Sequence, residues 1–184
     1  MNKALRPLLA ASAATAALAL PLPADAAYDM FLKLDGIQGE ATAKGHEKEI
    51  EVFSFSWGMA RTVQVMGARG ANAGRPCVSE MNLMKRMDKT TPLLMANVMS
   101  GMVIPKGKLT LRKAGGDIPL DFMVIELTSV LVSSVQESGS SGGDDTPMES
   151  ISVHFTSAKA TYTPQGPDGK PGSPVPASIQ GADC

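Results

Sequence analysis

The sequence predicts a mainly β fold, a barrel or sandwich of short strands with one helix covering an opening or edge. Short segments of alternating polar and apolar residues recur between positions 28 and 162, with glycine-containing turns between them. Residues 91–101 instead have helical spacing between a proline at their start and a glycine at their end. The strand pattern is clearest at residues 48–61, K-E-I-E-V-F-S-F-S-W-G-M-A-R, which hold the only tryptophan.

Residues 1–26 have the features of a signal peptide. A short basic region precedes an apolar, alanine-rich run at residues 8–20, and small residues occupy the −3 and −1 positions before Ala27. We therefore expect cleavage between Ala26 and Ala27. The apolar run is too short to span a bilayer, so no integral membrane segment is expected.

The chain that follows, residues 27–184, is long enough for one domain with its own core. We place this domain at residues 27–163. Residues 164–184 are rich in proline and glycine and are expected to form a flexible, disordered tail. Loss of residues 1–26 removes two basic residues and one acidic residue, so the formal charge changes from −1 to −2. Mixed charges without a basic stripe do not suggest a nucleic-acid partner.

The alternation within residues 48–61 changes phase between Val52 and Phe53. Such a change predicts a bulge, or a strand that is buried on different faces at its two ends. We expect the aromatic side chains of the second part to face the core: Phe53, Phe55 and Trp57. The small polar side chains between them, Ser54 and Ser56, are then expected to face outward.

Other segments with strand-like alternation are residues 28–34, 59–65, 78–84, 108–113, 120–135 and 148–162. Up to Leu127 the run that starts at Leu120 is apolar on both faces, which predicts burial on both sides or a position at an interface. The last segment changes phase after Phe155, which predicts a bulge. These segments and residues 48–61 give about seven strands.

The expected helix begins with Thr91 as a cap and Pro92 in its first turn, and it ends at Gly101. Its apolar residues lie on one stripe with two methionines beside it: Leu94, Val98 and Met102, with Met95 and Met99. Methionines at this spacing predict core packing rather than an adaptable binding surface.

Residues 66–75, M-G-A-R-G-A-N-A-G-R, show no periodicity and are expected to be a loop. The segment is long for a hairpin connection, so it is either a mobile loop or a segment that orders against a neighbouring subunit. The residues that we assign to a subunit contact under the second reading are Gly67, Arg69, Gly70, Asn72 and Gly74. Their glycine spacing matches no phosphate-binding fingerprint.

No catalytic, cofactor-binding or metal-ligating set is expected from the residues present. His46 and His154 are the only side chains whose ordinary pKa lies near neutrality, and neither belongs to a catalytic or metal-binding motif. The serines show no nucleophile elbow and no evident base. The two cysteines, Cys77 and Cys184, can form a disulfide in an exported chain; an intermolecular bridge and two free thiols are the alternatives.

Seven segments together resemble one known family and occur in its order along the chain. They are D-M-F-L-K-L-D-G-I-Q-G-E (29–40), H-x-x-E-I-x-V (46–52), S-W-G-M (56–59), D-K-T-T-P-L-L (88–94), L-T-L-R-K-A-G-G (109–116), V-L-V-S-S-V (130–135) and V-H-F-T-S-A-K-A-T-Y-T-P-Q (153–165). The chain resembles the haemolysin-coregulated protein (Hcp) family, the tube proteins of bacterial type VI secretion systems.

The resemblance implies a small barrel of two antiparallel sheets with one flanking α-helix, assembled as a hexameric ring. Rings of this family stack into a hollow tube inside a contractile sheath, with a spike at its tip and effector proteins in the lumen. Members in their plain form are cytoplasmic, leave the cell through the secretion apparatus without a cleavable signal, and are not enzymes. In such a ring the outward-facing Ser54 and Ser56 become candidate lumen positions that contact effectors.

Two features depart from the family. The signal peptide would direct the protein to the periplasm, unless the start codon is misassigned upstream of the native one. The tail ends P-A-S-I-Q-G-A-D-C, where an aromatic-rich end with asparagine is expected. The alternative interpretation is therefore a divergent, exported Hcp-like binding protein without tube function.

Overall fold

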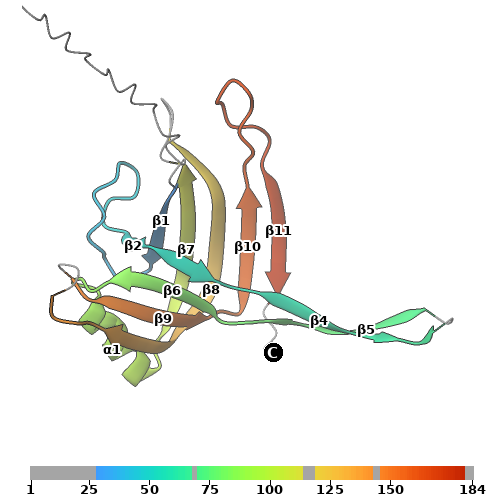
Figure 1. The fold of residues 1–184 in the computed structure, drawn as a ribbon, viewed down its shortest axis with the longest axis horizontal. Coiled ribbons are helices and arrows are strands. Elements are labelled where there is room, and N and C mark those ends of the chain that lie inside the picture. The colour runs from blue at the N-terminus through green and yellow to red at the C-terminus, as the bar shows by residue number, and fades with distance from the viewer. Residues whose placement is uncertain (1–27, 68–69, 114–118, 143–145, 181–184) are drawn as a thin grey trace, which may run out of the picture.

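The computed structural model describes residues 28–67, 70–113, 119–142 and 146–180 (Figure 1). These residues form eleven strands and one helix, so there are more strands than the expected seven. The first six strands are β1 Tyr28–Leu34, β2 Ile50–Val52, β3 Ser54–Ser56, β4 Met59–Val65, β5 Ala71–Val78 and β6 Met81–Arg86. Helix α1 Thr91–Ser100 precedes β7 Val103–Lys113, β8 Leu120–Ser138, β9 Met148–His154, β10 Ser157–Tyr162 and β11 Val175–Gln180.

The strands form a nine-stranded sheet and a separate two-stranded sheet, both antiparallel. The large sheet has the order β2-β1-β7-β8-β9-β6-β3, and β10 joins it by pairing with β8 and with β11. Strands β4 and β5 form the second sheet, a long hairpin that leaves the body (Figure 1). The mainly β class with one helix is confirmed, but the hydrogen-bonded path does not close into a barrel: its end strands β2 and β3 are joined only through Phe53.

The phase change at Val52–Phe53 marks the point where the chain changes its pairing partner. Val52 lies opposite Met30 of β1, whereas Ser54 lies opposite Met84 of β6. The Phe53 N–H donates to the Met84 carbonyl at 2.8 Å, and the Phe53 side chain is half exposed. The expectation that Phe53 faces the core is therefore wrong, because the residue lies at the corner between two pairings.

The two later aromatic residues do pack against the core, as expected. Phe55 and Trp57 are half-buried, and the Trp57 ring meets Phe155 edge to face at 5.5 Å. The centre of the core consists of side chains with no exposed area: Leu32, Ile50, Met81, Leu83, Leu94, Leu109, Val130, Ile151 and Val153. Each such side chain stabilises the fold by about 1.5–3 kcal/mol relative to an exposed position.

Helix α1 begins after Thr90, one residue earlier than expected, and ends at Gly101. Gly101 has φ +63°, a left-handed conformation that glycine adopts at little cost, and its N–H donates to the Asn97 carbonyl. Leu94 is fully buried, but Met99 is 87% exposed and Met102 is 62% exposed. The expected burial of the methionine stripe is thus wrong, since the helix turns only its Leu94 side toward the sheet.

Three further expectations about segment boundaries are corrected. The expected strand 78–84 divides into the end of β5 and the start of β6. The expected strand 148–162 is two strands, because the chain leaves the second half of β8 at Phe155 and then pairs with its first half. The tail is not disordered throughout: β11 pairs with β10 along its whole length, so residue 163 is not the end of the folded domain.

Candidate functional site

The outward face of β3, β6, β9 and the second half of β8 carries small polar side chains. The register places Ser56 opposite Asn82, Asn82 opposite Ser152, and Ser152 opposite Ser134. A second row, two residues away on each strand, consists of Ser54, Met84, Ser150 and Gln136. Directly opposed residues share one face of a sheet, so these eight form a single surface, here called the serine face.

Hydrogen bonds between side chains hold part of the serine face in place. The Ser152 hydroxyl donates to Asn82 Oδ1 at 2.6 Å, and the Ser134 hydroxyl donates to Ser152 Oγ at 3.1 Å. Ser54 and Ser56 are exposed, as the alternation predicts, and neither belongs to this network. The sequence shows the polar character of each strand separately, but only the register brings the four strands together.

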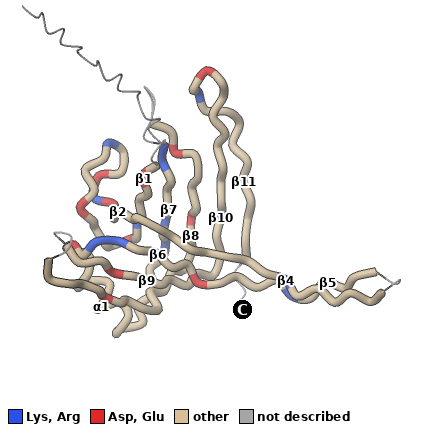
Figure 2. The backbone as a smooth tube through the Cα atoms, in the orientation of Figure 1, with Lys and Arg blue, Asp and Glu red and all other residues tan. Residues whose placement is uncertain are grey.

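The β4–β5 hairpin is the most exposed element of the described chain. Its outer part carries apolar side chains that face solvent: Val63 is 58% exposed, Val65 79% and Met66 58%. Among its described residues only Arg61 and Arg75 are charged, and Arg61 lies opposite Pro76 near the base. The described outer part of the arm carries no charged colouring in Figure 2. An apolar arm whose outer part packs on no described residue outside the hairpin is typical of a segment that contacts another molecule.

The loop expected at residues 66–75 is mostly strand, and that expectation is wrong from Ala71 onward. Gly67 and Gly70 form the described part of the turn with positive φ angles of +59° and +95°, while Arg69 lies outside the described residues. Asn72 lies opposite Gln64, and Gly74 follows in the same strand. The sequence predicted a loop because glycine and alanine are poor strand formers. In the structure, cross-strand hydrogen bonds stabilise the hairpin despite this low strand propensity.

Two sequence-predicted features are not tested by the described residues: the signal cleavage point and the disulfide. Ala26 and Ala27, at the expected cleavage point, lie outside them. Cys77 lies half-buried in β5 and is not a free thiol, but Cys184 lies outside the described residues. The bridge between the two cysteines therefore stays a prediction.

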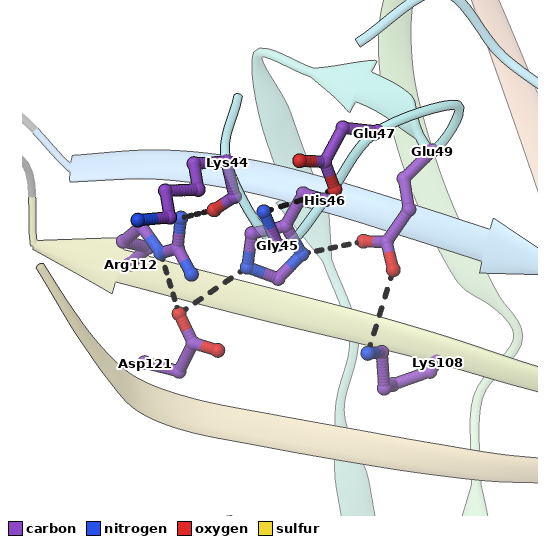
Figure 3. A network of polar contacts seen from close by, with 8 residues as sticks. All are labelled: Lys44, Gly45, His46, Glu47, Glu49, Lys108, Arg112 and Asp121. Carbon is purple, nitrogen blue, oxygen red and sulfur yellow. Dashed lines mark hydrogen bonds and ion pairs between the residues drawn. The ribbon is translucent and has the colours of Figure 1, made fainter. Parts of the chain in front are cut away.

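His46 is buried at the centre of a polar network that ties the loop before β2 to the sheet (Figure 3). Its ring stacks on Phe31 with 4.4 Å between centroids. Nδ1 lies 2.7 Å from Glu49 Oε2, and Nε2 lies 3.3 Å from Asp121 Oδ1. Both ring nitrogens therefore lie within reach of carboxylate oxygens, which accept a hydrogen bond from a ring nitrogen that carries a proton.

Two cations complete the network around His46. The Arg112 Nε donates to Asp121 Oδ1 at 2.7 Å, and another guanidinium nitrogen donates to the Lys44 carbonyl at 2.7 Å. Lys108 Nζ lies 3.4 Å from the second oxygen of Glu49. These contacts tie the loop before β2 to strands β7 and β8.

Burial would raise the pKa of Asp121, but hydrogen bonds from Arg112 and His46 outweigh it and hold the pKa below its usual 3.8. A lowered folded-state pKa means that the carboxylate stabilises the fold above its unfolded-state pKa, and that this contribution is lost as the pH falls through the folded value. We expect Asp121→Asn to lower the Tm at pH 7 by about 1–3 °C, a small effect because the carboxylate is partly exposed.

The difference in Tm between wild type and Asp121→Asn should shrink when the pH falls below about 4, in thermal unfolding followed by circular dichroism. Asp168→Asn is the matched control, since Asp168 is exposed in the β10–β11 loop. A difference that stays constant from pH 7 to pH 3 would contradict the assignment.

A second buried network, which sequence reasoning missed, fixes the start of α1. Lys85 and Glu149 are both fully buried, and Lys85 Nζ lies 2.6 Å from Glu149 Oε1 and 2.8 Å from Asp88 Oδ1. The Thr91 hydroxyl donates to the other oxygen of Glu149 at 2.8 Å. Burial would raise the pKa of Asp88, but hydrogen bonds from Lys85 and Thr90 outweigh it and lower the pKa.

The described residues contain no group of three or more histidine, cysteine, aspartate or glutamate side chains that could hold a metal ion. The helix in the described part of the chain lacks the length and apolar character needed to cross a membrane. Two kinds of surface stand out instead: a polar sheet face and an apolar arm.

The fold and these surfaces define a class of two-sheet β proteins with a projecting hairpin. Residues 31–162 match the family described as type VI secretion system effector, Hcp. The chain belongs to this Hcp family of type VI secretion proteins.

Individual relatives agree with this assignment. The protein hcp1 of Pseudomonas aeruginosa is 41% identical over 150 residues, which cover 81% of this chain and 92% of the relative. A solved structure of a type six secretion system protein has a TM-score of 0.80 and 33% identity over 84% of this chain and 96% of its own. Hcp1 from Salmonella typhimurium has a TM-score of 0.67 and 31% identity, over 84% of this chain and 94% of its own.

Proposed function

We propose that this protein forms hexameric rings that stack into the type VI secretion tube and carry effector proteins in the lumen. Its further partners are the spike and sheath components of the apparatus, and it works without a cofactor or catalytic site. Membership of the Hcp family supports the system and the type of protein. The arm and the serine face support the roles within the ring.

The exposed hairpin is the observation that carries the proposal. Val65 and Met66 are more than half exposed at the end of an arm whose outer part packs on no described residue outside the hairpin. If a neighbouring subunit covers this arm, the arm and the surface that receives it are different parts of the chain. Each subunit then offers its arm to the next one, so the same contact repeats from subunit to subunit. Repeated head-to-tail contacts close into a ring when the rotation between subunits allows it.

Light scattering of the purified chain that starts at Ala27 tests the proposal. We expect a species with six times the mass of the chain. A species that is strictly monomeric at high protein concentration would overturn the ring. Rings that form but never stack would instead favour a divergent binding protein without tube function.

Ser56→Gln is expected to reduce effector retention several-fold while rings stay intact. The longer side chain would project from the serine face, which we assign to the lumen, and would occupy space that a cargo protein needs. Retention is measured as the amount of a co-expressed effector that co-purifies with the rings. Ser100→Gln, at an exposed position of α1 outside the serine face, is the matched control and should retain the effector. Equal retention by both variants would count against Ser54 and Ser56 as lumen residues.

We propose further that the protein is secreted, with passage through the periplasm if residues 1–26 are used as a signal peptide. N-terminal sequencing of the protein from each compartment distinguishes the routes. A start at Ala27 is expected in the periplasm and outside the cell. Recovery of the intact N-terminus from all compartments would contradict cleavage.

A further inference from the structure

A row of charged side chains crosses the outward face of β1, β7, β8 and β10. The register places Lys33 of β1 directly opposite Lys108 of β7. It places Glu126 of β8 between Lys108 and Lys159 of β10. Leu109, which follows Lys108, points the other way and is fully buried, so the row faces outward.

A second row lies two residues along each strand and shares this face. It begins with Asp35 and Lys106, which are joined by a backbone hydrogen bond, and continues with hydroxyl and amide side chains on β8, β10 and β11. Both rows line a hollow of about 510 Å³ that extends across the five strands. We call its charged members the lysine array: Lys33, Asp35, Lys106, Lys108, Glu126 and Lys159.

The lysine array has an excess of positive charge that the fold does not neutralise. Lys108 is partly paired with Glu49 at 3.4 Å, and Lys159 with Glu126 at 3.7 Å. Lys33 and Lys106 make no ion pair with any residue that the structure describes. Four lysines face three carboxylates, those of Asp35, Glu126 and the neighbouring Glu49, so one positive charge is left over in the hollow of a chain whose formal net charge is −1.

The position of Lys33 opposite Lys108 is unfavourable for folding. Like charges directly opposed on neighbouring strands destabilise a sheet, and an acidic residue at either position would remove the repulsion. Residues that conflict with a local folding rule are typical of functional surfaces, where the compensating interaction comes from a partner.

We propose that the lysine array binds an extended acidic segment of a partner protein. Five strands about 4.8 Å apart span roughly 20 Å, which matches about six residues of extended chain at about 3.3 Å each. The array contains no aromatic side chain on which a nucleic-acid base could stack, so a row of carboxylates fits it better than a single-stranded nucleic acid. This proposal concerns a different face from the serine face and does not depend on ring formation.

Fluorescence anisotropy with a labelled hexaglutamate peptide tests the proposal on the full chain. We expect the peptide to bind the wild type at low salt, to bind more weakly as salt is added, and to lose at least tenfold in affinity with Lys33→Glu/Lys106→Glu. The control Lys44→Glu/Lys89→Glu changes the net charge equally at exposed positions outside the array, and its affinity should stay within about twofold of wild type.

Equal affinity of the wild type and the array variant would overturn the proposal, as would an equal loss in the control. Tighter binding of a six-nucleotide DNA strand than of hexaglutamate would overturn the assignment to an acidic protein segment.

The single variant Lys33→Glu distinguishes an effect on peptide binding from an effect on stability, because it places a negative charge directly opposite Lys108. We expect it to weaken peptide binding and to raise the Tm by about 1–3 °C. A lowered Tm would mean that Lys33 serves the fold, and would count against the array as a binding surface.

Discussion

Replacing Lys85 with methionine is expected to lower the free energy of unfolding by about 3–5 kcal/mol, because it leaves a buried carboxylate without its cation. Lys85 and Glu149 have no exposed side-chain area and lie 2.6 Å apart. Glu149 also accepts a hydrogen bond from the Thr91 hydroxyl, so the loss of stability extends to the first turn of α1. Urea unfolding of both proteins at pH 7 and equal protein concentration measures the difference.

A double variant distinguishes an unpaired buried charge from simple loss of packing. Lys85→Met/Glu149→Leu removes both charges and should recover most of the loss, since a buried ion pair is often replaced by apolar residues at little cost. The exposed Lys89→Met is the matched control and should change the free energy of unfolding by less than about 0.5 kcal/mol. If Lys85→Met unfolded at the same urea concentration as the wild type, the Lys85–Glu149 pair would not stabilise the start of α1.

Shortening the β4–β5 hairpin is expected to convert rings into monomers without unfolding the monomer. Residues 63–74 would be replaced by a two-residue Asn-Gly turn, which keeps the pairing of Met59 with Val78 and of Arg61 with Pro76. The removed part contributes no side chain to the buried core, so the monomer should keep its circular dichroism spectrum. Light scattering measures the mass, and thermal unfolding at a concentration where both proteins are monomeric compares stability.

A pair of point variants tests the same contact without changing the backbone. Val65→Ser removes an apolar side chain that is 79% exposed on the arm, and we expect it to weaken ring assembly at least tenfold. Val175→Ser removes one that is 64% exposed on β11, and it should leave assembly unchanged. Intact rings after the hairpin is shortened would show that the arm is not a ring contact, whatever the point variants do.

The sequence alone predicted the features that depend on local periodicity and local backbone preference. Alternation located most of the large sheet, and it placed Ser54 and Ser56 on the outward side of their strand. Pro92 and Gly101 located the helix within one residue, because both act through their own backbone conformation. The seven segments that resemble the Hcp family identified the system, and the comparisons confirm that identification.

The sequence contained part of the signal for the buried pair of Lys85 and Glu149. Lys85 follows Met81 and Leu83 at spacing two, so alternation places it inward, where a cation needs a partner. That partner, Glu149, lies on β9, far along the chain, and sequence spacing gives no information about which strands are neighbours. The same holds for His46 and Asp121, which come together only when β8 lies beside β7.

Tertiary structure alone decided which distant strands pair, and with them two of the surfaces on which function is proposed. The serine face and the lysine array exist because strands distant in sequence lie in register, and register is a property of the whole sheet rather than of one strand. Phe53 is exposed although its neighbours predict burial, because the chain changes partners there. The glycine-rich segment before Val78 and the proline-rich tail form strands against their own propensities, since hydrogen bonds to a neighbouring strand outweigh a weak local preference.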